Sequence, residues 1–248
     1  MTWEDFEKGM QKCNVVIVPV GSTEQHGAHL PLGTDTMVAN VLAEGASERT
    51  GAIIAPPVWY GWSPHHMVLP GTVTIRPEVL AELLFDIIES LQQHGARKFV
   101  VINGHRIVNI SWMQIACERA QRTLGVKTII FDPAYMSKEI SSKLGFGPVG
   151  HAEEAESSHM LCCYPELCHL ERALDYTPGH KALYSVDPGF RGDTLCYVPS
   201  TVNDMGQSVR AAKGTTGSPS RSSGEKGKEY HEHLVGRLVE VIKDLQES

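Results

Sequence analysis

The chain has 248 residues, of which 42% are hydrophobic and 21% are charged, so it is long enough to bury one sizeable core. We expect a single domain over residues 1–248. The formal net charge of -7 disfavours binding to nucleic acid or membrane surfaces, which usually requires clustered Lys and Arg, so a small molecule is the expected partner. We expect a cytoplasmic protein, because no apolar run approaches the ~20 residues of a membrane span and the start lacks a secretory signal.

The first part of the chain predicts a strand followed by a helix. Residues 14–20 form a short apolar run rich in β-branched side chains, typical of a strand buried on both faces of a parallel sheet. From Asp35 to Ala46 apolar residues recur at helical spacing, and Gly51 follows the expected helix end. Residues 52–55 predict a second, shorter strand before Pro56.

The same alternation continues through the middle of the chain. An amphipathic helix is expected over residues 78–91, a strand over 98–102, a helix over 111–124 and a strand over 127–131. The alternation predicts an α/β fold of three α/β/α layers, in which helices cover both faces of a mostly parallel sheet. Residues 170–222 predict long loops with one or two short strands, and a possible capping box from Ser222 to Glu225 begins a final helix.

Cysteine usage predicts buried free thiols. The six cysteines form no paired CxxC units. Cys162, Cys163 and Cys168 lie close together in the sequence, but adjacent cysteines on a helix point about 100° apart and rarely share an ion. We therefore expect no metal site formed by these cysteines.

Candidate metal ligands follow the first predicted strand. Glu24 and His26 are two residues apart, so in an extended segment they point to the same side, and Asp35 stands at the start of the next helix. Open α/β sheets bind ligands at this carboxyl edge. The structural alternative is that Glu24 and His26 are exposed loop residues and Asp35 caps a helix.

Two further positions extend this set. His105 follows the strand over residues 98–102, so it is expected at the same edge of the sheet, although it could be a structural histidine. Glu156 shares a helical stripe with Met160 and Cys163, which would turn its carboxylate toward the core. A buried carboxylate needs a metal ion or a cationic partner.

The stretch from Pro19 to Asp35 resembles the signature of the creatininase family. Further matches in chain order are Tyr60-Gly61-Trp62-Ser63 with His66, Pro70-Gly71-Thr72, Asn103-Gly104-His105 with Asn109, His151 with Glu156, and Gly217-Ser218-Pro219 with Glu225-Lys226-Gly227. The resemblance implies a creatininase-like fold and a hexameric assembly.

By this resemblance, a pair of divalent cations would be bound by Glu24, His26, Asp35 and His105, with Asp35 between them. Oxygen and imidazole ligands favour zinc, with manganese or iron as alternatives. His151 would move protons near the scissile bond, and Ser63 would contact the substrate.

The sequence departs from the enzymes that act on creatinine. Ile107 stands where the resemblance leads us to expect a glutamate ligand of the second metal, and we predict that Glu156 replaces it. Gly147-Pro148 replaces an expected Trp-Asp pair. Arg106 occupies the place of an aromatic substrate contact, and we expect it to bind an anionic or carbonyl-rich part of the substrate.

These departures argue against creatinine as the substrate. The leading hypothesis is a metal-dependent amidohydrolase that cleaves a C–N bond of a small cyclic amide, such as a lactam, imide or hydantoin, or of a formamide. One alternative is a peptidase-like maturation enzyme of the same family, which would need an open groove. The other is a non-catalytic metal-binding module, for which Ile107 is the sequence argument.

Overall fold

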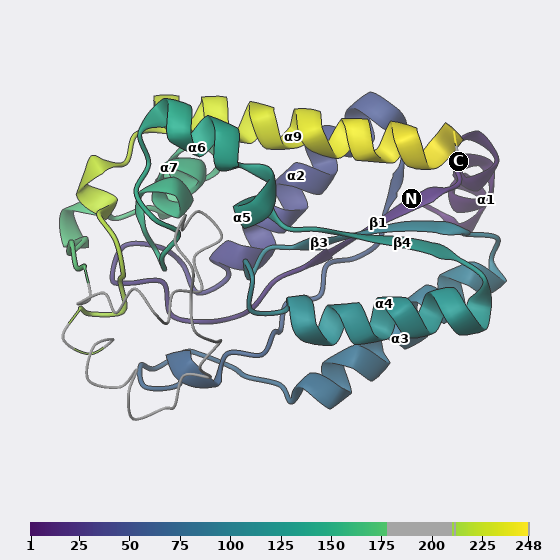
Figure 1. The fold of residues 1–248 in the computed structure, drawn as a ribbon, viewed down its shortest axis with the longest axis horizontal. Coiled ribbons are helices and arrows are strands. Elements are labelled where there is room, and N and C mark those ends of the chain that lie inside the picture. Colours follow the sequence, from purple (N-terminus) through teal and green to yellow (C-terminus); the bar gives the residue numbers. More distant parts are fainter. Residues whose placement is uncertain (178–209, 211, 248) are drawn as a thin grey trace, which may run out of the picture.

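A parallel sheet of four strands forms the centre of the computed structural model, which describes residues 1–177, 210 and 212–247. The strands are β1 (Val15–Val20), β2 (Ile53–Ile54), β3 (Lys98–Asn103) and β4 (Lys127–Phe131), in the spatial order β2-β1-β3-β4 (Figure 1). All pairs are parallel, and β1 is buried along its whole length. The continuous apolar run of β1 is therefore explained by burial on both faces.

Helices cover both faces of this sheet. One layer consists of α3 (Pro77–Gln93) and α4 (Ile110–Leu124), and the other includes α2 (Thr34–Thr50), α7 (Glu154–Cys163) and α9 (Gly224–Glu247) (Figure 1). Each face of the sheet has its own hydrophobic core, and the side chains of β1 alternate between the two. Val15 and Ile17 pack on the side of α2 and α9, whereas Val16 and Val18 pack on the side of α3 and α4. The three-layer α/β/α prediction is confirmed.

Several helices were not expected from the sequence. These are α1 (Trp3–Lys12), α5 (Pro133–Met136) and α6 (Lys138–Leu144), together with the short 3₁₀ turns η1 (Pro64–His66), η2 (Pro165–Leu167), η3 (Leu170–Arg172) and η5 (Pro219–Arg221). The α1 helix begins at a capping box between Thr2 and Asp5 and has no fully buried residue. The capping box thus fixes the start of α1, and Phe6 and Met10, one helical turn apart, pack against the core on the side of α3 and α4.

The start of α9 differs from the prediction by one residue. The hydroxyl of Ser223, rather than that of Ser222, accepts the backbone N–H of Lys226 at 3.2 Å. Ser222 instead donates to the backbone carbonyl of Glu154 at 3.2 Å, which ties the start of α9 to α7. The strands expected in residues 170–222 fall largely outside the described residues, which retain an isolated antiparallel bridge between Tyr176 and Gly217.

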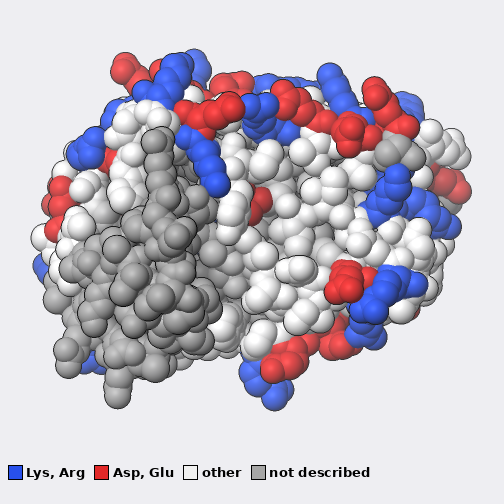
Figure 2. All heavy atoms as spheres, viewed as in Figure 1, with Lys and Arg blue, Asp and Glu red and all other residues white. Residues whose placement is uncertain are grey.

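Charged side chains of both signs alternate along the edge formed by α9 on the face shown in Figure 2. Several are paired with neighbouring elements, as in Lys143 with Glu229 at 2.8 Å and Arg237 with Glu139 at 2.8 Å. Such exposed pairs contribute little to stability. Among the described helices, none has the length and apolar character needed to cross a bilayer.

Candidate metal centre

Two glycines allow the first turn of α2 to lie against the ends of the central strands. A Cβ on Gly104 would lie 2.0 Å from the carbonyl oxygen of Asp35, and one on Gly21 would lie 2.3 Å from the backbone nitrogen of Thr36. Neither contact is sterically tolerable, so both positions need glycine. This close approach places Asp35 beside the segments that follow β1 and β3.

One group of ligand atoms consists of Glu24, Asp35 and His105. The Nδ1 atom of His105 lies 3.2 Å from Glu24 Oε1 and 3.0 Å from Asp35 Oδ2. All three side chains are buried, so the structural alternative of an exposed Glu24 is wrong. The residues that follow β1 and β3 thus meet at the carboxyl edge of the sheet.

A second group shares Asp35. The Nε2 atom of His26 lies 3.0 Å from Asp35 Oδ1 and 4.0 Å from Glu156 Oε2. Glu156 lies in the first turn of α7, on the helical stripe that was predicted from the sequence to face the core. Asp35 therefore presents one carboxylate oxygen to each group.

Buried oxygen atoms in these groups suit a cation. Both carboxylate oxygens of Glu24 and Oδ2 of Asp35 are buried and have no hydrogen-bond partner among the described residues, although His105 Nδ1 faces both side chains. Unpaired buried carboxylate oxygens are costly, whereas oxygen and imidazole lone pairs that converge on one point are a fit donor set for zinc, manganese or iron. The residues present therefore fit a pair of divalent cations.

The pKa values of these groups reflect two opposing effects, burial of the charged forms and attraction between opposite charges. Burial opposes the charged form of Glu24, but His105 more than compensates and lowers its pKa. Burial likewise opposes the charged form of His26, but Asp35 raises its pKa to about 9. For Glu156, burial dominates and raises the pKa to about 7, despite the opposing effect of Arg106.

His151 lies at the edge of the cluster. Its Nε2 atom is 2.6 Å from the carbonyl oxygen of Gln25, so this nitrogen donates and Nδ1 is left as the lone-pair atom, 3.7 Å from Glu24 Oε1. Burial first, and then His26, lower the pKa of His151 well below its usual value. His151 also forms a potential ligand group with Glu24 and His26, so its position is compatible with either a proton carrier or a ligand.

His66 was quoted from the sequence only as a family landmark, but it is part of the cluster. Its ring stacks on that of His151 with centroids 3.9 Å apart, and its Nε2 atom lies 3.3 Å from Glu24 Oε1. Gln25 holds the other ring nitrogen, with its Nε2 atom 2.7 Å from His66 Nδ1. The signal that could have found His66 was its place in the matched stretch between Ser63 and Pro70.

Arg106 contacts acidic side chains of the same chain. It forms a two-pronged pair with Glu153, in which Nη1 and Nη2 each donate at 2.8 Å, and its Nε donates to Glu156 Oε1 at 3.0 Å. The side chain is 7% exposed. Arg106 is thus a cationic partner of Glu156. The sequence predicted that Glu156 needs a cation or a cationic partner, but it did not identify Arg106 as that partner.

Two residues with left-handed backbone conformations flank these contacts. Ile107 has φ 69° and Ala152 has φ 51°. The N–H of Ile107 donates to Asp132 at 2.7 Å, and the N–H of Ala152 donates to Glu156 Oε2 at 2.7 Å. Such conformations cost roughly 1–3 kcal/mol each and persist where surrounding contacts hold them, as they do at many functional sites.

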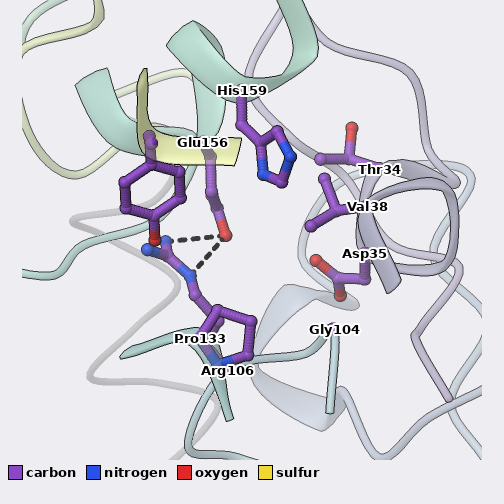
Figure 3. Close-up of a pocket in the computed structure, with 9 residues that line it drawn as sticks. Thr34, Asp35, Val38, Gly104, Arg106, Pro133, Glu156 and His159 are labelled. Atoms are coloured by element: carbon purple, nitrogen blue, oxygen red, sulfur yellow. Dashed lines mark hydrogen bonds and ion pairs between the residues drawn. The ribbon is translucent and has the colours of Figure 1, made fainter. Parts of the chain in front are cut away.

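Figure 3 shows the small cavity beside Asp35, into which Glu156 and His159 point from α7 and Arg106 points from the opposite side. Ser63 lies elsewhere in the cluster, buried, with its hydroxyl 3.4 Å from His105 Nε2 and 2.6 Å from the hydroxyl of Ser22. Of the residues expected from the sequence, Glu24, His26, Asp35, His105, His151, Glu156, Arg106 and Ser63 all lie in or directly beside this cluster.

Comparison with known proteins identifies relatives along the whole chain. The creatininase family model, described as creatinine amidohydrolase, matches residues 1–242. The chain is 31% identical to 3-dehydro-scyllo-inosose hydrolase of Thermotoga maritima over 260 residues, which covers 100% of the chain and 82% of that protein. It is 27% identical to creatinine amidohydrolase of Pseudomonas putida over 263 residues, covering 98% and 95%. A shorter match of 97 residues, 46% identical, links it to the mycofactocin precursor peptide peptidase of Mycolicibacterium smegmatis and covers 37% and 39%.

Solved structures agree with these relatives. The crystal structure of creatinine amidohydrolase (creatininase) has a TM-score of 0.84 at 27% identity and covers 100% of the chain and 96% of that protein. Similar structures include a mutant creatininase of Zn-Zn type, with a TM-score of 0.83, 27% identity and coverage of 100% and 97%. They also include a creatininase Mn structure, with a TM-score of 0.80, 26% identity and coverage of 100% and 97%.

Proposed function

Because the chain belongs to the creatininase family, we propose that it is a metal-dependent hydrolase that cleaves a C–N bond of a small cyclic amide or formamide with metal-activated water. The observation that carries this proposal is the sharing of Asp35 by two groups of potential ligands, Glu24 with His105 and His26 with Glu156. Sites of two cations held by a shared carboxylate suit hydrolysis.

Asp35 would lie between two divalent cations, each completed by one of these groups. Zinc is the favoured metal, since the donor set mixes imidazole and carboxylate, and manganese or iron are the alternatives. Bound cations would lower the pKa of a water molecule and polarise the carbonyl of the substrate.

His151 would carry the proton. Because its Nε2–H is held by the Gln25 carbonyl, Nδ1 is free to accept a proton from the attacking water. The lowered pKa of His151 keeps this nitrogen unprotonated at neutral pH. The same atom would then return the proton to the leaving nitrogen, without which amine expulsion is slow.

Ser63 and Arg106 are proposed substrate contacts. The buried Ser63 hydroxyl lies beside His105, where a polar group of the substrate would meet it. Arg106 is already paired with Glu153 and Glu156, so it would bind substrate only through a shared or rearranged contact. If Arg106→Met leaves the Michaelis constant unchanged, its substrate role is wrong.

The relatives suggest a second candidate. The substrate named for the Thermotoga maritima hydrolase is an inosose, a carbocyclic polyol ketone without a C–N bond. The 3-dehydro prefix adds a second ketone to this ring. The same cluster could activate water against one carbonyl, so that a C–C bond between the two ketones breaks, the electron pair passes to the enolate of the other ketone, and reprotonation of that enolate gives an open-chain keto acid. A peptidase activity is also named among the relatives, but that match covers 37% of the chain.

The test combines metal analysis with a substrate screen. Protein purified without added metal is analysed for bound ions and then assayed on lactams, imides, hydantoins, formamides, carbocyclic diketones and short peptides. Release of an amine or carboxylate from a C–N substrate, lost with chelator and restored by zinc, supports the proposal. Turnover of the diketones alone would favour the second candidate, and metal binding without any turnover would favour a non-catalytic module.

A further inference from the structure

A separate group of metal-ligating side chains lies where α7 packs against α9. His159 and Cys163 are one helical turn apart on α7, and His231 approaches them from α9. One ligand atom from each lies within 4.8 Å of the other two. We propose that His159, Cys163 and His231 form a second metal site, which binds a zinc-type cation and fastens α7 to α9.

The spacing of the donor atoms fits such an ion. His159 Nε2 lies 2.9 Å from His231 Nδ1, and Cys163 Sγ lies 3.9 Å from the same nitrogen. Tetrahedral zinc with bonds of about 2.0–2.3 Å requires donor separations of roughly 3.3–3.6 Å. The observed distances lie on either side of this range, so small side-chain rotations bring the three donors around one ion.

The protonation states also fit. Burial lowers the pKa of His159 to about 3 and also lowers that of His231, so both imidazoles are neutral near pH 7. Burial raises the pKa of the Cys163 thiol to about 12, so the thiol carries its proton when no cation is present. Binding one divalent cation therefore releases one proton from Cys163, while each histidine keeps its proton on the nitrogen that faces away from the ion.

The proposal departs from the expectation that Cys162, Cys163 and Cys168 take no part in a metal site, because it uses Cys163 together with two histidines. It does not require neighbouring cysteines to share an ion. Cys162 and Cys168 are absent from the group, and Cys168 Sγ donates to the Tyr164 carbonyl at 3.4 Å instead. The sequence could not show the site, since His231 lies on a different helix. Three protein ligands leave the fourth position to water.

The site would stabilise the helix that carries Glu156. His159 follows Glu156 by one turn of α7, and both side chains line the same small cavity (Figure 3). A cation at His159 would fix α7 against α9 next to the cavity that Asp35 and Glu156 also line. This role does not depend on the reaction that the enzyme catalyses.

Cobalt provides a probe that separates the two sites. A cysteine thiolate bound to Co²⁺ absorbs in the near ultraviolet through charge transfer, whereas the groups around Asp35 contain only carboxylate and imidazole donors. Metal-free protein titrated with Co²⁺ should develop this band, saturating at about one equivalent of thiolate-bound ion. The band should disappear in Cys163→Ser and His231→Ala and persist in the matched control Cys162→Ser. Absence of the band in the wild type, or its survival in Cys163→Ser, would overturn the proposal.

A second measurement uses the wild-type protein, so its outcome does not depend on whether the variants fold. Zn²⁺ should slow alkylation of Cys163 by about tenfold or more relative to chelator-treated protein, because a metal-bound thiolate is shielded. Mass spectrometry of the modified peptides reports this rate and, as an internal control, that of Cys168, which should not change. Equal rates at Cys163 with and without Zn²⁺ would mean that His159 and His231 are only a neutral hydrogen-bonded pair.

Discussion

Glu156 divides its two carboxylate oxygens between different partners. Oε1 accepts from Arg106, and Oε2 accepts the N–H of Ala152 while facing His26 at 4.0 Å. Because a carboxylate oxygen has two lone pairs, Oε2 could accept this N–H and still help to hold a cation beside Asp35, while Arg106 balances the remaining charge. This arrangement explains how the cluster could do without a carboxylate at Ile107.

The charge of Glu156 is therefore expected to decide metal stoichiometry. In Glu156→Gln the number of bound ions should fall from about two to about one, since a neutral amide is a poor ligand for the cation near His26. Glu153→Gln is the matched control: it also removes a carboxylate that pairs with Arg106 but lies in neither ligand group. Metal analysis that finds two ions in both variants would show that Glu156 is not a ligand.

His151 is expected to matter for turnover rather than for metal retention. His151→Ala should lower kcat by about 100-fold or more, because general acid–base catalysis contributes at least that much. Metal content should stay close to that of the wild type, and His169→Ala, a change at a half-exposed side chain, should alter neither quantity. Loss of an ion from His151→Ala would instead identify His151 as a ligand, which its proximity to Glu24 and His26 permits.

The buried His29 side chain joins the loop after β1 to helix α7. Its Nε2 atom lies 2.9 Å from the hydroxyl of Ser157, and burial lowers the pKa of His29 to about 4. The unfolded chain protonates this histidine near its ordinary pKa of about 6.5, so it binds more protons than the folded protein between those values. Stability from neutral His29 is thus present above about pH 6.5 and is lost as the pH falls toward 4.

This linkage predicts a pH-dependent difference between variants. Between pH 7 and pH 5 the metal-free wild type should lose about 1–2 kcal/mol more unfolding free energy than His29→Gln, which lacks the titrating ring. Urea unfolding at the two pH values measures the difference, and His169→Gln serves as the exposed control. Identical losses in the wild type and His29→Gln would show that His29 is not held neutral by the fold.

The elements that could be predicted from the sequence are those in which the pattern of apolar side chains directly reflects which residues are buried. The continuous apolar run gave β1, and helical periodicity gave α3 and α4, within one or two residues. The α1 helix was missed because its apolar stripe is short: Phe6 and Met10 pack against the core, but neither is fully buried. The α5 helix was missed because four residues are too few to show a period.

The candidate site was partly accessible to the same reasoning. Parallel strands end at one edge, so the proximity of Glu24, Asp35 and His105 followed from topology. The pairing of Arg106 with Glu153 did not, because it joins segments 47 residues apart through side chains whose directions only the folded chain defines.

An exposed apolar patch of three side chains lies next to the candidate site. Leu32, Trp59 and Val73 are 41%, 46% and 41% exposed. Thr23 connects two of them. Its backbone forms an antiparallel bridge with Val73, and its hydroxyl donates to the Trp59 carbonyl at 2.7 Å. The N–H of Glu24 in turn donates to the Leu32 carbonyl at 2.9 Å, so Leu32 and the candidate metal ligand Glu24 are joined across one loop. Contiguous apolar surface of this kind is usually covered by another protein surface.

A second copy of the chain is the expected cover, since the resemblance to creatininases implies a closed hexamer. Light scattering coupled to size-exclusion chromatography should therefore return a hexamer at micromolar concentration. Trp59→Glu should shift the assembly toward smaller species, because it places a charge in an apolar contact that must be dry. Trp3→Glu changes a tryptophan that is 75% exposed on α1, at the end of the molecule where both termini lie (Figure 1), and should leave the assembly intact. A monomeric wild type would exclude the hexamer, and an unchanged hexamer in Trp59→Glu would place the subunit contacts away from Leu32, Trp59 and Val73.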